Sequence, residues 1–221
     1  MKTITLFLIV AVTGVVTACH HMGASVRGSG NRIMQKRDIA NFRSLSTEGA
    51  YDVRVVCQKE PSLEIEGDDN ILPIISAEVS GNVLRVKSLR NYSVGEPIMI
   101  RISVPTLEGL SVSGAGRIEI EGLKNDRFEI DSSGAPTIRV AGVTNVVDID
   151  SKGAAKIDTH KLHAARAVVD SSGVSKIDLD VKDQLDVTIN GPSQVTYNGD
   201  PVVNKTIRGP GKLEKKASEG T

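Results

Sequence analysis

Aromatic residues are scarce in this chain of 221 residues. Tryptophan is absent, and three phenylalanines and three tyrosines make up the whole aromatic content. The core must therefore be built from Val, Ile and Leu, and thin layers of β-branched residues suit stacked strands. Enzymes that act on polysaccharides usually stack sugar rings on aromatic side chains, so this scarcity argues against that class.

An excess of either charge is absent as well. The chain has 27 basic and 27 acidic residues, and removal of residues 1–18 takes away Lys2 and no carboxylate. The remaining chain has 26 basic and 27 acidic residues, which is a net charge of −1. Because binding a phosphate backbone needs a clear basic excess, this balance argues against nucleic acid as a partner.

The longest apolar run lies at the N-terminus and is too short to span a membrane. It covers residues 4–12 and is broken only by Thr5, with Lys2 before it and small residues at 14–18 after it. These features are typical of a secretory signal. We therefore expect residues 1–18 to be a signal peptide.

Cys19, one of only two cysteines, is the predicted lipidation site. The run Val16-Thr17-Ala18-Cys19 resembles the bacterial lipobox, in which cleavage before the cysteine leaves a diacylated N-terminus. A lipid would tether the chain to a membrane in the cell envelope, the outer membrane if the cell is Gram-negative, on its periplasmic or surface side. The alternative is an ordinary signal peptide that is cut nearby, with Cys19 incidental. Cys57 then has no intrachain partner, and its apolar neighbours predict a buried strand thiol.

Evenly spaced glycines dominate the second half of the chain. They follow one another at 20, 19, 20, 18 and 18 residues: Gly114, Gly134, Gly153, Gly173, Gly191 and Gly209. A repeat this short cannot bury its own apolar face, so successive copies must stack. Strand-like copies with a glycine turn stack as the coils of a β-solenoid. The sequence therefore predicts an all-β fold, a right-handed β-helix with coils of about 19 residues.

Aliphatic and charged residues alternate within each coil, so one set must point inward and the other outward. The aliphatic residues four positions after the glycines are Ile118, Ile138, Ile157, Ile177, Val195 and Leu213. The aliphatic residues that stand four positions before the first five glycines are Leu110, Ile130, Ile149, Val169 and Val187. The predicted outward columns are Arg117, Thr137, Lys156, Lys176, Gln194, Lys212 and Glu119, Arg139, Asp158, Asp178, Thr196, Glu214.

The same offsets recur around Gly49, which places the first coil there. The long interval before Gly114 predicts strands at 62–66, 82–87 and 98–104, with a short helix at 71–75 after Asp68-Asp69-Asn70. The expected organisation is a lipidated N-terminus and tether over 19–38 and a single solenoid domain over 39–215. A polar tail over 216–221 follows.

Several of these features together resemble a known family. They are the lipobox, the strand and short helix, Ser103-Val104-Pro105, Leu107 and Leu110 before Ser113 to Gly116, and repeated Ser-Ser-Gly turns. Over about residues 40–212 the chain resembles the putative auto-transporter adhesin head GIN domain. The resemblance implies attachment at the surface or envelope, and it supplies no set of catalytic residues.

The sharpest candidate for chemistry is a column of three aspartates. Asp131, Asp150 and Asp170 stand three residues before a glycine in successive coils. Strands stack about 4.8 Å apart, so these carboxylates could approach one another and bind Ca²⁺. The alternative is that each carboxylate accepts a hydrogen bond from a backbone N–H of its own turn. A hydrogen bond within each turn can offset the electrostatic repulsion between neighbouring carboxylates, so no metal is needed. We therefore expect neither a metal nor a cofactor.

Three classes of function remain open. The first is a non-catalytic, envelope-anchored module for binding or adhesion, whose ligand is a glycan or an envelope protein. The second is a polysaccharide lyase or hydrolase of the β-helix type, and the third is a structural or stress-sensing envelope protein. Fold alone cannot choose among these classes. The missing aromatics and the balanced charge favour the first class, so we expect a binding or adhesion module.

Overall fold

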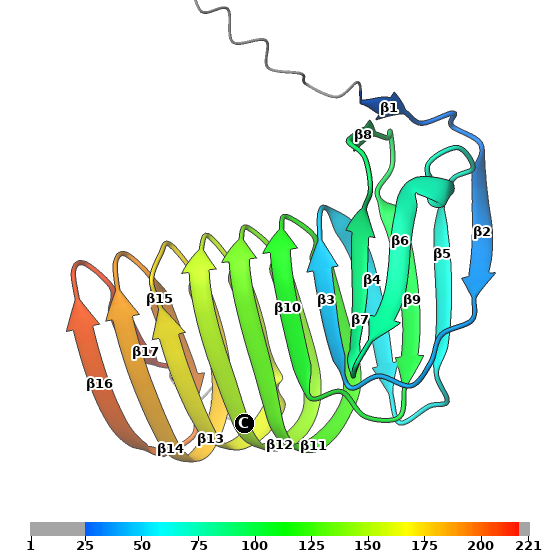
Figure 1. The fold of residues 1–221 in the computed structure, drawn as a ribbon. Helices are drawn as coiled ribbons and strands as arrows, with labels where there is room; N and C mark the ends of the chain where they lie inside the picture. The colour runs from blue at the N-terminus through cyan, green and yellow to red at the C-terminus, as the bar shows by residue number, and fades with distance from the viewer. Residues whose placement is uncertain (1–24, 217–221) are drawn as a thin grey trace, which may run out of the picture.

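The computed structural model describes residues 25–216, most of which lie in strands. Each coil has two straight arms that pair in parallel with those of the next coil, so the arms form two facing sheets (Figure 1). Single bent strands run through both arms: β11 (Arg117–Gly134), β12 (Thr137–Gly153), β13 (Lys156–Ser171) and β14 (Lys176–Asn190). The prediction of an all-β solenoid is confirmed.

We call the arms that lead into the glycine turns sheet A and the arms that leave them sheet B. The shorter strands of sheet A are β3 (Ser44–Glu48), β10 (Gly109–Gly114) and β16 (Val202–Arg208). Those of sheet B are β4 (Tyr51–Cys57), β15 (Gln194–Asn198) and β17 (Lys212–Lys215). The turn at Gly49 joins β3 to β4, which confirms the first coil.

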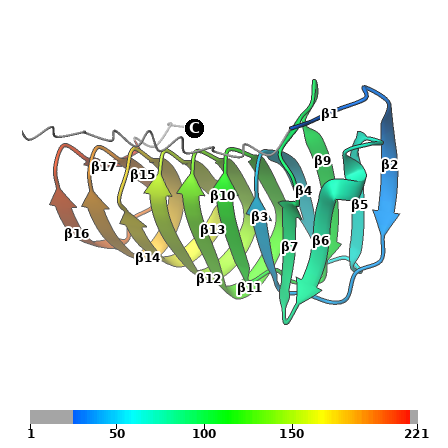
Figure 2. The same cartoon turned by 45° about the horizontal axis from the view of Figure 1, so that its top comes forward.

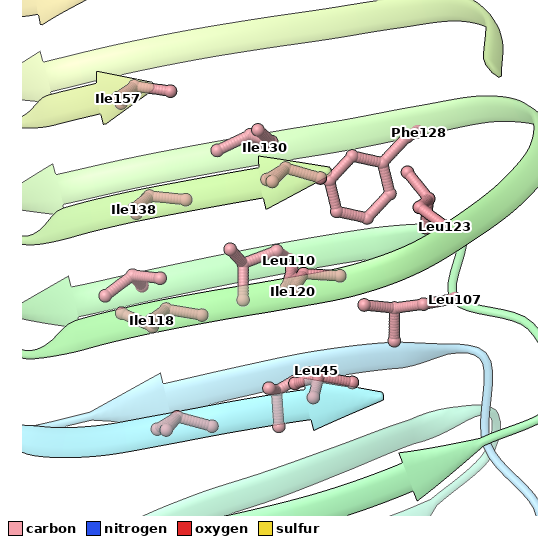
Figure 3. Packing of buried hydrophobic residues seen from close by; sticks show 14 of the residues in the cluster. Leu45, Leu107, Leu110, Ile118, Ile120, Leu123, Phe128, Ile130, Ile138 and Ile157 are labelled. Atoms are coloured by element: carbon pink, nitrogen blue, oxygen red, sulfur yellow. The ribbon is translucent and has the colours of Figure 1, made fainter. Parts of the chain in front are cut away.

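The two aliphatic sets form the inward columns, in register from coil to coil. Figure 3 shows Leu110 and Ile130 of sheet A facing Ile118 and Ile138 of sheet B across the core. All members are at most 3% exposed except Leu213, which lies on the last strand and is partly buried. The predicted outward columns are also in register. Hydrophobic burial between the sheets therefore holds the coils together.

The uneven glycine spacing has a single structural origin. The bends from sheet B to sheet A contain six, five, six, four and four residues (121–126, 141–145, 160–165, 180–183 and 198–201). The arms and the glycine turns keep a constant length. The bends therefore absorb every insertion, which leaves the opposite edge regular.

At the regular edge, the glycine turns leave no room for a side chain. A Cβ atom on Gly153 would lie 2.3 Å from the carbonyl oxygen of Gly134, and φ of Gly153 is +154°. A Cβ atom on Gly134 would meet Gly114 at the same distance. The next backbone N–H, that of Ala154, donates to the Gly134 oxygen at 2.7 Å. Only glycine allows the turns to stack this closely.

A cap of residues 58–108 replaces the bend of the first coil and extends both sheets. It contains β5 (Ser62–Asp68), the 3₁₀ turn η1 (Leu72–Ile74), β6 (Ile75–Ser80), β7 (Val83–Ser88), β8 (Tyr92–Ser93) and β9 (Ile98–Val104). The hairpin of β6 and β7 continues sheet A beyond β3, and β9 and β5 continue sheet B beyond β4. The three predicted strands are confirmed. The predicted helix is reduced to one 3₁₀ turn, because β6 begins at Ile75.

The assignment of residues 19–38 to a tether is wrong for its second half. Residues 26–27 form β1 and residues 32–37 form β2, which pairs in antiparallel fashion with β5 at the edge of the cap (Figure 2). The side chain of Asp68 accepts a hydrogen bond from the Gly30 N–H, and Asp69 accepts one from Ser29. These carboxylates hold the N-terminal segment instead of capping η1, which has no side-chain cap. The signal peptide, Cys19 and residues 217–221 lie outside the described residues.

One inward column of sheet A ends with a charged residue in the last coil. Lys205 of β16 follows Val187 in register, at a position where the preceding coils carry aliphatic side chains. An inward-pointing lysine on an edge strand opposes pairing with another strand. The C-terminal end of the solenoid is therefore protected against further stacking.

The inward column yields a first prediction. Ile157 is fully buried in mid-stack, so Ile157→Ala should lower the free energy of unfolding by about 2–5 kcal/mol. The neighbouring Lys156 is exposed on the outer face, and Lys156→Ala should change it by less than about 0.5 kcal/mol. Urea denaturation of both variants measures the difference. Equal losses would show that the inward and outward faces are assigned wrongly.

The glycine edge yields a second prediction. Gly153→Ala should lower the free energy of unfolding by more than about 1 kcal/mol, because the new methyl group strains φ and meets backbone. Gly95→Ala is the matched control, since a Cβ atom there meets nothing within 4 Å. Thermal melts compare the two variants. An unchanged melting temperature for Gly153→Ala would contradict the close stacking of the turns.

Candidate binding cleft

The three predicted aspartates lie in one column on the outer face of sheet A. Asp131, Asp150 and Asp170 are in register, and the first and last are exposed to water. Asp150 accepts a hydrogen bond from Lys152 Nζ at 2.6 Å. Within residues 25–216 none of the three accepts a backbone N–H of its turn, so the turn-capping alternative is not observed. No group of three or more His, Cys, Asp and Glu side chains in this range is arranged to hold a metal ion.

Further carboxylates widen this column into an acidic patch. Glu129 and Asp148 lie opposite each other, two residues before Asp131 and Asp150 on the same strands, and Arg127 binds both at 2.8 and 2.6 Å. Burial raises the pKa of Asp148 above its ordinary value, Arg127 opposes this shift, and the neighbouring carboxylates add to it. The patch is flat and open to water, and its arginine is already paired.

The histidines at 160 and 163 do not converge on one site. His160 contacts Asp158 through Nδ1, and His163 contacts Asp180 through Nδ1 at 2.5 Å. His160 also lines a shallow cleft of about 250 Å³ on the outer face of sheet B. Arg139 in that cleft binds Glu119 at 3.0 Å, so these polar groups already satisfy one another.

A larger cleft of about 730 Å³ lies where the cap meets the glycine edge. We call it the cap cleft. It is lined by the turn from Glu48 to Tyr51, by the end of β7 and by the loop around β8. Two of the three tyrosines of the chain, Tyr51 and Tyr92, lie in its lining. Figure 1 shows β8 and β1 standing beyond the ends of β7 and β3 at this edge.

Tyr51 carries an unsatisfied hydroxyl at the base of the cap cleft. The residue is 1% exposed, and its hydroxyl has no hydrogen-bond partner. The ring packs against Gly49, where a Cβ atom would lie 3.1 Å from it, and Tyr92 lies close enough to raise the pKa of the Tyr51 hydroxyl further. Burial raises the pKa of Tyr51 far above the neutral range, so the hydroxyl stays protonated. A buried hydroxyl without a partner costs about 1–3 kcal/mol, which a bound group can recover.

Two basic side chains line the same cleft. Lys87 lies opposite Glu48 in the register of β7 with β3, and Arg90 follows at the start of the loop. Among the ion pairs of residues 25–216, none involves Lys87, Arg90 or Glu48. These charges are therefore available to a ligand.

The N-terminal segment supports the loop of the cap cleft. The Val26 N–H donates to the Asn91 carbonyl at 2.9 Å, and the Gly28 N–H donates to the Ser93 carbonyl at 2.8 Å. The side chain of Asn70 in turn binds the Arg27 carbonyl at 2.8 Å. Sequence reasoning missed this site because its parts are some forty residues apart. The one indication in the sequence is that two of its few aromatic residues lie nearby. Tyr51 follows the glycine of the predicted first coil, and Tyr92 lies in the segment that forms the cap.

Cys57 has the expected structural setting. It is 3% exposed at the end of β4 and is a free thiol. Burial raises its pKa to about 11, so it remains protonated and unreactive at neutral pH. The prediction of a buried strand thiol is confirmed.

The acidic patch yields a third prediction. Because its pKa is raised, Asp148 binds its proton more tightly in the folded state than in the unfolded state. The free energy of unfolding therefore falls as the pH rises from the ordinary pKa of 3.8 through the raised pKa. Asp148→Asn should remove this loss and leave the melting temperature at pH 7 equal to or above that of the parent. Melts between pH 4 and pH 7 test this, with the exposed Asp170→Asn as control. A lower melting temperature at pH 7 would show that the pair with Arg127 outweighs the burial of the charge.

Comparison with solved structures places the fold. A putative adhesin from Bacteroides fragilis is 22% identical, with a TM-score of 0.73 and coverage of 87% of this chain and 100% of that chain. A putative adhesin from Parabacteroides merdae is 19% identical, with a TM-score of 0.55 and coverage of 87% and 99%. A putative lipid binding protein from Parabacteroides distasonis is 19% identical, with a TM-score of 0.55 and coverage of 88% and 100%. At these identities the likeness shows the fold alone.

No curated protein is significantly similar to the chain. Within residues 25–216, no helix has the length and apolarity needed to cross a membrane. The profile described as putative auto-transporter adhesin, head GIN domain, matches residues 41–201, which is most of the chain. The chain therefore belongs to the family of putative auto-transporter adhesin head GIN domains.

Proposed function

We propose that the protein is a lipid-anchored module of the cell envelope that binds a glycan or an envelope protein without changing it chemically. The cap cleft carries this proposal, because it combines an open hollow with charged side chains and a buried hydroxyl that lack partners. Membership of a family of putative adhesins supports a binding role. The solenoid serves as a rigid support for this end of the molecule.

The setting of the acidic side chains supports binding over catalysis. Catalytic carboxylates act best where water is excluded and fixed dipoles surround the reacting atoms. Asp131 and Asp170 instead lie exposed on a flat sheet face. A reaction there would compete with bulk water, whereas adhesion does not need a dry site.

The start of the folded segment supports anchoring close to a membrane. Cys19 precedes Val26 by seven residues, which span at most about 25 Å when fully extended. Strand β1 begins at Val26 beside the loop of the cap cleft. A lipid on Cys19 would therefore hold this end of the solenoid near the bilayer surface and leave the distal coils projecting from it.

A binding screen separates this function from the two alternatives. The full chain, purified in detergent, is applied to an array of glycans and envelope polymers, and bound oligosaccharides are eluted and weighed by mass spectrometry. We expect saturable binding to at least one surface and recovery of the ligand at unchanged mass. Cleaved or unsaturated products would identify a hydrolase or a lyase, and the absence of binding would favour a structural role.

Anchoring yields a fourth prediction. Cells that express the parent protein should incorporate radiolabelled palmitate into it, and Cys19→Ala should abolish the label. Cys57→Ala is the matched control, because the buried thiol at 57 is not expected to carry lipid. Label that persists in Cys19→Ala would refute the lipidation of Cys19.

A further inference from the structure

We infer that the cap cleft binds an acidic saccharide, a sugar ring that carries a carboxylate. This inference rests on the proposed binding function and names the ligand class of its site. The cleft, at about 730 Å³, falls within the range of small-molecule sites, about 300–1,000 Å³. Its lining contains hydrogen-bonding groups, apolar surface and more positive than negative charge.

The basic side chains select an anionic ligand. Lys87 and Arg90 lie on the same lining, and within residues 25–216 neither forms an ion pair. A guanidinium group binds a carboxylate through two parallel hydrogen bonds, and a nearby ammonium group adds a second positive charge. A ligand carboxylate therefore fits the end of the cleft formed by β7 and the loop that follows it.

The hydroxyl of Tyr51 indicates a polar ligand at the base of the cleft. Buried polar groups in folded proteins nearly always have a hydrogen-bond partner. This hydroxyl has none in the described part of the chain, although the residue is only 1% exposed. Water does not reach this atom in the structure, so a hydroxyl of a sugar ring can bond it only when the lining beside Tyr51 shifts.

The remaining lining favours a sugar over a bare phosphate ion or a lipid headgroup. Glu48 would repel either anion, but its carboxylate can accept hydrogen bonds from the hydroxyls of a sugar ring, which adds a favourable contact for a saccharide. Asn91 adds an amide with both donor and acceptor atoms. The half-buried Tyr92, together with Val94 and Pro97, offers apolar surface to the carbon face of a ring.

Calorimetry on the full chain in detergent tests this ligand class. The probes are trigalacturonate, a hyaluronan tetrasaccharide and sialyllactose, each paired with its methyl ester, which keeps the ring and removes the charge. Inorganic phosphate and glycerophosphoglycerol, the soluble headgroup of phosphatidylglycerol, are the competing anions. We expect at least one acidic probe to bind, with its ester and both competing anions weaker by about tenfold or more.

Variants then locate the site. The double variant Lys87→Gln, Arg90→Gln should weaken binding by about tenfold or more, because it removes both positive charges. Tyr51→Phe should also weaken binding, but it should not lower the melting temperature of the free protein, since no hydrogen bond within the chain is lost. If Tyr51 had a purely structural role, Tyr51→Phe would change the binding and the melting temperature together. The matched control is Lys156→Gln, Lys176→Gln, which removes two exposed charges from the outer face of sheet B.

Each contrary result has a definite meaning. Binding that persists in the cleft variants would overturn the cap cleft as the site while leaving the binding module intact. Equal binding of the methyl esters, or tighter binding of phosphate or of glycerophosphoglycerol, would overturn the acidic saccharide. If no probe binds and the glycan and polymer array is also blank, the binding function itself fails.

Discussion

The close contact between successive glycine turns is the constraint on which the rest of the structure depends. At Gly134 and Gly153 the carbonyl oxygen of the previous turn occupies the space that a Cβ atom would need. The turns can therefore stack at strand spacing, and the arms on both sides remain in register. This register brings aliphatic residues from every coil into the same inward columns. Variation in length is confined to the opposite edge, where the bends from 121–126 to 198–201 differ by up to two residues.

Repetition explains which parts of the fold could be predicted from the sequence. The inward columns, the glycine edge and the coil at Gly49 follow from offsets that recur in each copy. Strand β2 has no such copy, and Ile33 and Met34 remain 43% and 56% exposed on it, so no inward face was evident. The serines of the glycine turns follow a burial pattern that the sequence did not indicate. The serine two positions before the glycine is buried in three coils, at Ser132, Ser151 and Ser171, although the turn at 151–153 reads Ser-Lys-Gly.

The candidate site could not be derived in the same way. The aspartates drew attention because they repeat, yet repetition placed them on a flat outer face. The cap cleft instead depends on tertiary contacts that have no local pattern. It joins the turn at Gly49 to the loop at 88–97, and that loop is held by a segment that appeared to be a tether. The pairing of β1 with β8 shows that residues 26–28 support the loop of the cap cleft.

The end of the repeat explains why we expect a binding site at the cap rather than along the coils. In a stack of similar coils, outward charges can pair with those of the neighbouring coil, as Arg127 does with Asp148 and Arg139 does with Glu119. Such pairs give solubility and little stability, and they occupy the charged groups that form them. At the cap the repeat ends, and neither Lys87 nor Arg90 forms an ion pair within residues 25–216. Of the two buried side-chain atoms without a partner in residues 25–216, Ser132 Oγ lies within the coils and the hydroxyl of Tyr51 lies where the repetition stops, at the edge of the cap cleft.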